Sequence, residues 1–542
     1  MNRNKKYKSN FYLLFYFFSV LLVPIHGATH YVYKNASGSN DGSNWVNAWI
    51  SFADINWSII VPGDTIKISG GTDSLSYNET LYVNVSGTSD RPVTISSAVE
   101  EGYNGRVIID GDSIRGTGIY ILAKKYINIA GIKVTNHIGN DIYVSGASGS
   151  VYSESDASSY ITLDSLEVNI TGRAVFIQTS DHIIVKNCNI YTPTLVAHQT
   201  DGIYSQRNQN NFYDHNNIVI NNTDPNGHDD GIQMYEDMSI TVCNNYIEQN
   251  NGKVGNAQGI YSTNGHGDNI WYNNVVALVN GTTSNGISYR LNLDGTISMI
   301  GNTVYCERAF NTMYVEDVPD PIIKNNILWN DYLAAPLTLI NWNGNPANID
   351  NNLLYGPNTS EGIVKISDVE WLSWSDYQQR GFDAHGVNAN PEFVNVTGKD
   401  FRLKPNSPAI NAGVTLDAPF NVDKEGTIRP FGTAYDIGAY EYTGITGIKV
   451  GERIFPDFKL EQNYPNPFNP TTVINYYLPR SSYVSLKVYN LIGQEVATLV
   501  NKQQAKGSYR IDFDASTFAS GVYFYKLKAG NYNQSKKMLL LR

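Results

Sequence analysis

A short motif recurs along the middle of this chain: a β-branched strand, then one or two Asn, then another apolar pair, as at 183–190 and 240–247. Gly-Ile pairs form a second column with spacings of 29, 28 and 27 residues, beginning at Gly202, Gly231, Gly259 and Gly286. The Asn column has spacings of 28, 28, 29, 28, 24 and 26 residues, and its members are Asn189, Asn217, Asn245, Asn274, Asn302, Asn326 and Asn352. Two columns that advance together indicate one coil of several short strands per repeat.

Stacked coils pair their strands in parallel at about 4.8 Å, so equivalent residues should lie on one another. Asn suits the corner of such a coil, because it tolerates the left-handed conformation and its amide can hydrogen-bond the Asn of the next coil. The pattern predicts an all-β chain built on a right-handed parallel β-helix. A leucine-rich horseshoe would show a Leu-x-x-Leu-x-Leu frame and a propeller would show tight antiparallel hairpins, and this sequence has neither.

Composition narrows the function classes. Only 16% of residues are charged and the net charge is −11, which argues against a nucleic-acid partner and is compatible with cation binding. The 38 Tyr and 46 Gly fit many strands joined by turns. Three Cys, an odd number in a long chain, do not make a disulfide framework.

The N-terminus reads as an export signal. Arg3, Lys5 and Lys6 precede an apolar run at 11–23, which is shorter than the roughly 20 residues that span a bilayer. Gly27 and Ala28 offer small residues for cleavage, so we expect residues 1–27 to be a removed signal peptide. The mature protein should be an extracytoplasmic monomer without a transmembrane helix.

The C-terminal segment has a different pattern. Residues 463–472 read Asn-Tyr-Pro-Asn-Pro-Phe-Asn-Pro-Thr-Thr and precede alternating strands at 473–476, 484–489 and 521–527. This pattern predicts a small antiparallel β-sandwich. Residues 458–542 closely resemble the type A C-terminal sorting domain of Bacteroidetes-type (type IX) secretion. The resemblance implies periplasmic transit, contact with the type IX machinery and delivery to the cell surface or the medium. A carbohydrate-binding accessory module is the alternative.

Both ends of the repeat region also resemble known proteins. Val-Pro-Gly-Asp-Thr-Ile at 61–66 and Val-Ile-Ile-Asp-Gly at 107–111 resemble the opening of pectin-lyase-like β-helix proteins, including the alginate lyase and chondroitinase B group. Residues 407–413 and 429–441 resemble the C-terminal cap of secreted bacterial β-helix proteins. We therefore place the β-helix with its cap at 28–442, and a linker at 443–457. The resemblance implies a polysaccharide lyase or a glycoside hydrolase.

The candidate site is the column that precedes each Gly-Ile pair. Its spacings are 28, 29, 28 and 27 residues, and its members are Arg173, Asp201, Asp230, Gln258 and Asn285. Two carboxylates in adjacent coils would lie about 5 Å apart and repel, so a shared proton, an Arg or a metal must neutralise the pair. Arg173 is one candidate and Ca²⁺ is the other, because Ca²⁺ prefers oxygen ligands. The predicted metal ligands are Asp201, Asp229, Asp230 and Glu236.

Three chemistries fit this column. In a lyase, a cation binds the uronate carboxylate and a base removes the C5 proton. In a hydrolase, Asp201 and Asp230 form the catalytic pair, at a spacing typical of retention. In a binding protein the same groups only hold Ca²⁺ or sugar hydroxyls, and Asp-Gly alone is also common in turns. The candidate catalytic residues are Asp201, Asp230, His198, His228, Arg173 and Arg207. The candidate substrate-binding residues are Tyr204, Gln233, Tyr235, Gln258, Tyr261 and Arg290.

Two motifs of this column resemble the polygalacturonase family. Thr-Asp-Gly at 200–202 and Asp-Asp-Gly at 229–231 match its first two motifs, with Gln199 in place of an Asn. Gln258 stands where the family has a His, and only Arg290 keeps the last motif. We therefore predict a secreted protein that cleaves a uronate-containing polysaccharide, by β-elimination first and by hydrolysis second. A non-catalytic β-helix that binds glycans is the alternative from another class.

Overall fold

The computed structural model describes most of the predicted domains. Its residues are 27–149, 151–169, 172–192, 200–221, 228–250, 257–279, 283–332, 334–356, 362–367, 369–444, 459–460, 463, 468, 470–478, 482–504, 507–530 and 532–540. The predicted signal peptide, apart from Gly27, lies outside them, and so do His198 and most of the predicted linker. None of the described helices has the length and apolar character that crossing a bilayer requires.

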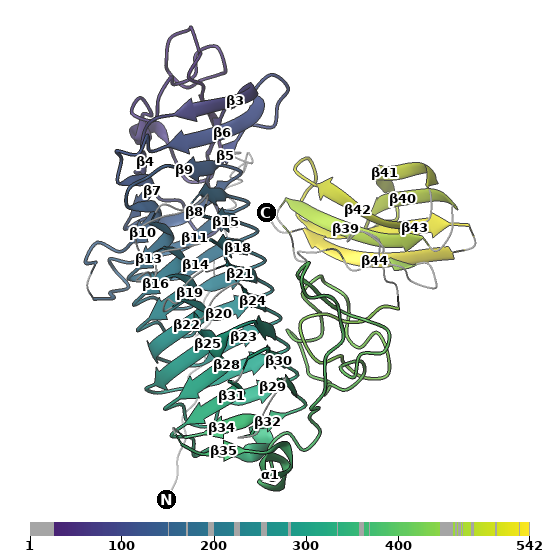
Figure 1. Ribbon diagram of the computed structural model, residues 1–542. Helices are drawn as coiled ribbons and strands as arrows, with labels where there is room; N and C mark the ends of the chain where they lie inside the picture. The colour runs from purple at the N-terminus through teal and green to yellow at the C-terminus, as the bar shows by residue number, and fades with distance from the viewer. Residues whose placement is uncertain are drawn as a thin grey trace, which may run out of the picture. The chain divides into compact units, whose positions relative to one another are not determined.

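Three parallel sheets run along the first part of the chain, and each coil contributes one strand to each sheet (Figure 1). The chain passes from sheet A to sheet B to sheet C and then to sheet A of the next coil. Parallel strands joined by such crossovers form a right-handed parallel β-helix, which confirms the predicted fold.

Sheet A has twelve strands: β1 (Thr29–Val32), β2 (Thr65–Ile68), β5 (Val93–Ser97), β8 (Lys125–Ala130), β11 (Ser158–Asp164), β14 (Ser180–Lys186), β17 (Phe212–Asp214), β20 (Thr241–Cys243), β23 (Asn269–Tyr272), β26 (Ile297–Ile300), β29 (Ile322–Lys324) and β32 (Ile349–Asp350). Sheet B has eleven: β3 (Gly71–Tyr77), β6 (Asn104–Asp110), β9 (Lys133–Thr135), β12 (Glu167–Asn169), β15 (Asn189–Tyr191), β18 (Asn217–Ile220), β21 (Tyr246–Asn250), β24 (Val275–Val279), β27 (Thr303–Cys306), β30 (Ile327–Asn330) and β33 (Leu353–Tyr355).

Sheet C has twelve strands: β4 (Leu81–Val83), β7 (Thr117–Leu122), β10 (Asn140–Ser145), β13 (Arg173–Gln178), β16 (Asp201–Gln206), β19 (Asp230–Tyr235), β22 (Gln258–Gly265), β25 (Thr283–Asn292), β28 (Ala309–Glu316), β31 (Ala335–Ile340), β34 (Val364–Ile366) and β35 (Trp371–Leu372). β35 alone pairs antiparallel within this sheet. The described helices are the 3-10 turns η1 (Trp57–Ile59) and η2 (Pro346–Asn348) and the short helix α1 (Trp374–Gln379).

The Gly-Ile column forms part of the interior of the helix. Ile203 pairs with Ile232, which pairs with Ile260, and all three side chains are fully buried. Steric crowding explains why a Gly precedes each of these Ile residues. A Cβ on Gly202 would lie 2.5 Å from the Gly231 carbonyl oxygen and 2.6 Å from Cγ2 of Ile218. Stacked β-branched residues thus fill the core, while Gly allows adjacent coils to approach.

A column of buried amides joins the coils at the corner between sheets A and B. The backbone N–H of Asn245 donates to Oδ1 of Asn274 at 3.1 Å, and Nδ2 of Asn245 donates to the same oxygen at 3.0 Å. Nδ2 also donates to the Tyr213 carbonyl at 2.9 Å. The same pattern repeats down this amide ladder, whose amide members are Asn216, Asn245, Asn274, Asn302, Asn326 and Asn352.

Two members of the predicted Asn column were assigned wrongly. Asn189 and Asn217 each lie one residue after the ladder position, at the exposed starts of β15 and β18, and Asn217 pairs with Tyr246. The ladder positions in these two coils belong to Cys188 and Asn216. Sequence spacing alone could not separate Asn216 from Asn217, because the two adjacent residues are identical and a one-residue shift changes only which side chain points inward.

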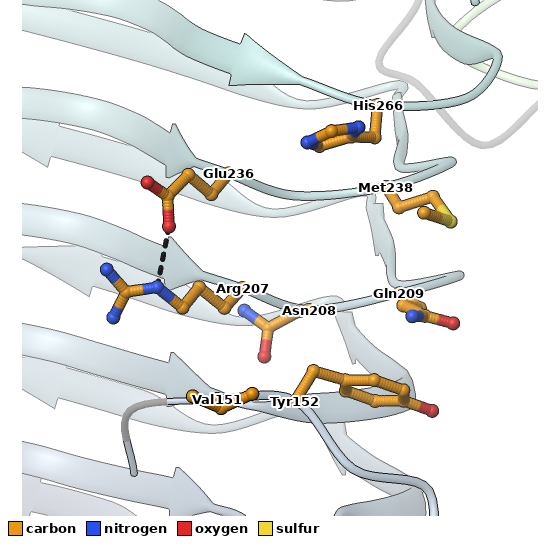
Figure 2. A pocket seen from close by; sticks show the side chains of 8 residues that line it. All are labelled: Val151, Tyr152, Arg207, Asn208, Gln209, Glu236, Met238 and His266. Carbon is orange, nitrogen blue, oxygen red and sulfur yellow. Dashed lines mark hydrogen bonds and ion pairs between the residues drawn. The ribbon is translucent and has the colours of Figure 1, made fainter. Parts of the chain in front are cut away.

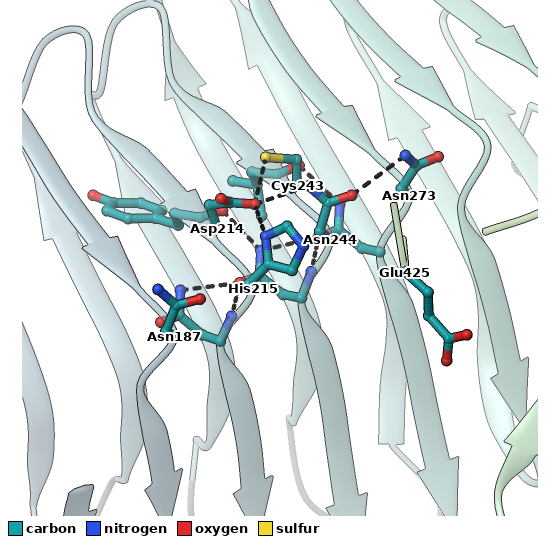
Figure 3. A network of polar contacts seen from close by, with 12 residues as sticks. Asn187, Asp214, His215, Cys243, Asn244, Asn273 and Glu425 are labelled. Atoms are coloured by element: carbon teal, nitrogen blue, oxygen red, sulfur yellow. Dashed lines mark hydrogen bonds and ion pairs between the residues drawn. The ribbon is translucent and has the colours of Figure 1, made fainter. Parts of the chain in front are cut away.

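The left-handed residue is also distinct from the ladder residue that follows it. This outer row has φ between 53° and 64°, and its members are Asn187, His215, Asn244, Asn273, Gly301, Asn325 and Asn351. Figure 3 shows its polar contacts: Nδ2 of Asn244 donates to Asp214 at 2.8 Å, and Nδ2 of Asn273 donates to Oδ1 of Asn244 at 3.3 Å. We had predicted that one Asn would both adopt the left-handed conformation and hydrogen-bond the next coil. In the structure the first of two adjacent residues adopts the conformation and the second makes the hydrogen bonds.

The amide ladder ends on a carboxyl group. Oδ1 of Asp383 accepts from the backbone N–H of Asn352 at 2.8 Å and from its Nδ2 at 3.0 Å. The Tyr377 hydroxyl donates to Oδ2 of Asp383 at 3.0 Å. Asp383 is fully buried, and burial raises its pKa to about 7.

The chain divides into two compact units, residues 1–384 and 385–542. The second unit holds the predicted cap region, with the hairpin β36 (Phe393–Asn395) and β37 (Asp400–Leu403), and an antiparallel sandwich. One sheet of the sandwich contains β38 (Lys459–Leu460), β39 (Thr471–Leu478) and β42 (Gly507–Asp514), and the other contains β40 (Ser482–Asn490), β41 (Glu495–Gln504), β43 (Gly521–Ala529) and β44 (Tyr532–Leu540). Its apolar core, which includes Leu486 and Tyr525, is separate from that of the β-helix and confirms the predicted sandwich.

The corrected column predicts unequal effects for two neighbouring substitutions. Asn216→Ala removes a side chain that accepts from Cys188 N–H at 3.1 Å and donates to the Val185 carbonyl at 2.8 Å. Leaving these buried groups unsatisfied should lower the free energy of unfolding by about 2–4 kcal/mol. Asn217→Ala, at an exposed position, should change it by less than about 0.5 kcal/mol. Urea unfolding of both variants checks this, and equal losses would contradict the corrected register.

The end of the ladder predicts a pH-dependent stability. The folded-state pKa of about 7 for Asp383 exceeds the unfolded value of about 3.9, so only the folded chain keeps this proton between those pH values. Stability should therefore fall as pH rises from about 4 to 7. Asp383→Asn keeps an acceptor and cannot ionise. We therefore expect its free energy of unfolding to exceed that of the wild type by about 1–3 kcal/mol at pH 8, and to differ little from it near pH 4. Thermal melting at both pH values measures this, and identical pH profiles would refute it.

Candidate functional site

The column that precedes each Gly-Ile pair lies at the start of the strands of sheet C, in the predicted register. Arg173 pairs with Asp201 across β13 and β16, and Asp230 pairs with Gln258 across β19 and β22. The backbone N–H of Asp230 donates to Oδ1 of Asp201 at 3.2 Å, so the two aspartates are direct neighbours.

Both aspartates are fully buried. Oδ2 of Asp201 lies 3.4 Å from Nε of Arg173, and Oδ1 of Asp230 accepts from the Gln258 N–H at 2.8 Å. Burial raises the pKa of Asp201 to about 7. Burial, together with the negative charge of Asp201, raises the pKa of Asp230 well above its usual range. Because Arg173 stabilises charge on Asp201, the pair at neutral pH holds a proton that belongs mainly to Asp230.

Two side chains stand in front of this buried pair and reach solvent. Nδ1 of His228 lies 3.4 Å from Oδ2 of Asp230, and 35% of the His228 side chain is exposed. Burial lowers the pKa of His228 below 6.5, which favours the neutral imidazole at pH 7. Arg173 is 32% exposed, and its guanidinium carbon lies 4.2 Å from the centre of the Tyr204 ring. The accessible groups of the site are therefore a cation and a neutral imidazole.

A row of aromatic rings leads to Arg173 along the outer face of sheet C. Successive ring centres are 5.6, 5.3, 5.3 and 5.1 Å apart, and the rings are those of Tyr82, Tyr120, Tyr143, Phe176 and Tyr204. Beyond Tyr204 the row continues as Gln233 and Tyr261. Sequence analysis found only Tyr204 and the residues after it. The earlier rings stand three residues after Thr117, Asn140 and Arg173, so extending the column upstream would have found Tyr120, Tyr143 and Phe176.

The remaining predicted residues lie elsewhere or have other partners. Arg207 and Glu236 follow the far ends of β16 and β19, about 20 Å along the strands from the aspartates. They form an ion pair of 2.6 Å with each other. Tyr235 lies beside Arg207, and Arg290 pairs with Glu316 at 3.5 Å. His198 lies outside the described residues.

The donors at the aspartate pair differ from a calcium site. Asp201, His228 and Asp230 each offer one ligand atom within 4.8 Å of the others. Oδ1 of Asp229 instead accepts from Thr200 N–H and Oγ1, at 2.8 and 2.6 Å, and Glu236 is too distant to share an ion with the pair. Ca²⁺ takes six to eight oxygen ligands. A set with one imidazole and the Arg173 cation alongside does not fit it.

Residues 462–541 match the family of secretion system C-terminal sorting domains. The chain thus carries a type IX sorting domain, which directs it to the cell surface or the extracellular space. No curated protein matches the chain.

Several solved structures are similar to the chain. One is the GH136 lacto-N-biosidase from Eubacterium ramulus, with 10% identity over 64% of this chain and 67% of that one and a TM-score of 0.38. A second is a mannuronic acid specific polysaccharide family 6 lyase from human gut microbiota, with 13% identity, 57% and 79% coverage and a TM-score of 0.22. A third is the mannuronan C-5 epimerase A-module from Azotobacter vinelandii, with 10% identity, 60% and 91% coverage and a TM-score of 0.20.

The donor set predicts that calcium is not needed at the aspartate pair. Dialysis against EDTA should leave the melting temperature unchanged, and added Ca²⁺ should not raise it. A Ca²⁺-dependent rise that disappears in Asp201→Asn would instead place the ion between the aspartates. Differential scanning calorimetry of both proteins, with Asn217→Ala as a matched surface control, measures this.

Proposed function

We propose that the β-helix is an enzyme that cleaves a uronate-containing polysaccharide beside Arg173 and His228. The observation that carries the proposal is the division of the site into accessible and buried groups. Arg173 and His228 reach solvent, while Asp201 and Asp230 lie behind them and are fully buried. A polymer could contact the cation and the imidazole directly, and the carboxyls would position both.

β-elimination uses these groups in a consistent way. The Arg173 guanidinium pairs with the uronate carboxylate and makes the neighbouring C5 proton more acidic. When Asp230 is ionised, its Oδ2, 3.4 Å from Nδ1 of His228, would favour the tautomer with the proton on Nδ1, which leaves Nε2 as the base that removes the C5 proton. The electron pair of that C–H bond forms the C4–C5 double bond, and the C4–O bond breaks. The leaving oxygen takes a proton from Tyr261, whose ring centre is 6.4 Å from that of His228, or from water.

The aromatic row supports binding of a polymer. Its five rings, from Tyr82 to Tyr204, repeat at about one coil spacing along the helix axis and end at Arg173. Aromatic faces can pack against the apolar faces of sugar rings while their hydroxyls hydrogen-bond. An extended chain laid along this row would bring one unit to His228.

Hydrolysis is the second candidate, and a separate observation favours it. Asp201 and Asp230 are carboxyls in adjacent coils with raised pKa values, and a protonated acid beside a carboxylate is the pairing that glycosidases use. This mechanism requires the substrate to reach the aspartates themselves.

Product analysis separates the proposals. We expect the full chain to release products that absorb in the ultraviolet, from the new double bond, when incubated with pectate, alginate or chondroitin. Arg173→Ala and His228→Ala should each lower the rate by about 100-fold or more, because they remove the charge partner and the base. Tyr332→Ala is a control on an exposed tyrosine. Reducing ends without ultraviolet absorbance would identify hydrolysis, and no product from a broad panel would refute the enzyme.

The pH profile gives an independent check. Elimination needs Asp230 to have lost its proton, and burial beside Asp201 raises the pKa of Asp230 well above its usual range, so the rate should rise with pH as Asp230 ionises. Hydrolysis needs one proton on the pair and should give a bell-shaped profile, lost on both sides. Initial rates between pH 5 and 9 distinguish these shapes, and an acid optimum alone would contradict elimination.

A further inference from the structure

A hollow opens at the corner that leads from sheet C to sheet A. Its volume is about 340 Å³, and Figure 2 shows the side chains that line it, among them Tyr152, Arg207, Gln209, Glu236, Met238 and His266. Four coils contribute to it: Gln209 pairs with Met238 and Met238 with His266 across the corner, and Tyr152 follows β10, two coils before Gln209. We call this hollow the corner pocket. It lies at the opposite ends of β16 and β19 from Asp201 and Asp230.

The carboxylates around the corner pocket each have a partner within the protein. Arg207 pairs with Glu236 at 2.6 Å, and His266 lies 3.1 Å from Asp294. Asp181, which pairs with Gln209 across the corner, lies 2.8 Å from His182. A uronate would meet the carboxylates of Glu236, Asp181 and Asp294, whereas a neutral ligand would leave these contacts in place. The charge pattern therefore differs from that of the aspartate site, where Arg173 faces solvent.

Polar and aromatic groups of the corner pocket remain available to a neutral ligand. Among the described residues, none hydrogen-bonds the side-chain amide of Gln209, and Tyr152 is partly exposed. Arg207 uses Nε for Glu236 and has further N–H donors on its guanidinium. These groups combine hydrogen-bond donors and acceptors with a flat aromatic face.

A stack of partly exposed rings lies at the same corner in the preceding coils. The rings of Tyr126 and Tyr160 are parallel within 5° at 4.8 Å, and those of Tyr160 and His182 are within 20° at 4.6 Å. His182 follows Asp181, the neighbour of Gln209, so the stack leads to the corner pocket. Burial, and then the charge of Asp181, raise the pKa of Tyr152, so its hydroxyl stays protonated as a hydrogen-bond donor at neutral pH. Because these rings stack face to face, they offer a ligand beside the corner pocket their edges and the hydroxyls of Tyr126 and Tyr160.

We propose that the corner pocket is a second glycan site, which binds an uncharged sugar unit through Tyr152, Gln209 and the Arg207–Glu236 pair. It would hold the enzyme on a polysaccharide that has neutral stretches, independently of cleavage at Arg173 and His228. This assigns a role to Arg207 and Glu236, which the aspartate site does not use.

Titration calorimetry on the full chain tests the proposal with cello-, xylo-, manno- and galacto-oligosaccharides, and with oligogalacturonate as the charged comparison. We expect at least one neutral series to bind. Tyr152→Ala and Gln209→Ala should each weaken that binding about tenfold or more, since each removes a contact of roughly 1.4 kcal/mol. Tyr332→Ala and Arg173→Ala should leave it unchanged.

Three results would overturn the proposal: no neutral series binds, binding persists in both pocket variants, or binding is lost in Arg173→Ala. Stronger binding of oligogalacturonate that depends on Tyr152 would overturn the neutral specificity. Circular dichroism of each variant confirms that the fold is retained. Because the readout is binding, a protein that cleaves nothing could still confirm the corner pocket, and an active enzyme could still refute it.

Discussion

Buried amide hydrogen bonds between successive coils are the constraint on which the rest of the β-helix depends. Each ladder Asn both donates and accepts, so it satisfies its own amide and the backbone of the neighbouring coil. The sequence separation of linked residues ranges from 24 to 31, yet the same corner is held in each coil from Cys188 to Asp383. Fixing one corner sets the register of the sheets on either side of it.

That register turns distant residues into neighbours in the site. Arg173, Asp201 and Asp230 lie in separate coils, and only parallel pairing brings them within contact of one another. Placing two carboxyls side by side without solvent is unfavourable, and the raised pKa values of Asp201 and Asp230 report that cost. A fold held by many coil-to-coil hydrogen bonds can tolerate such a local conflict, and conflicts of this kind are typical of functional sites.

The sequence alone predicted the features of the structure that follow from its periodicity or from recognisable motifs. The β-helix, the Gly-Ile column, the neighbouring aspartates and the sorting domain were all predicted from spacing or from motifs. Features that depend on side-chain direction were not. Asn216 and Asn217 are chemically identical, and only inward or outward orientation distinguishes them. Arg207 and Glu236 were grouped with the aspartates by closeness in sequence, whereas an extended strand separates them by about 20 Å. The corner pocket combines side chains of four coils and has no local motif.

The residue at the end of the ladder gives the β-helix a defined length. An amide can pass a hydrogen bond onward, because it carries donors and acceptors together. The carboxyl of Asp383 receives from Asn352 on one oxygen and from Tyr377 on the other, so no amide donor remains to engage a further coil. A stack of identical coils could otherwise continue into another molecule as a fibril does. Asp383 thus ends the amide ladder, because both of its oxygens already accept hydrogen bonds from the last coil and from Tyr377.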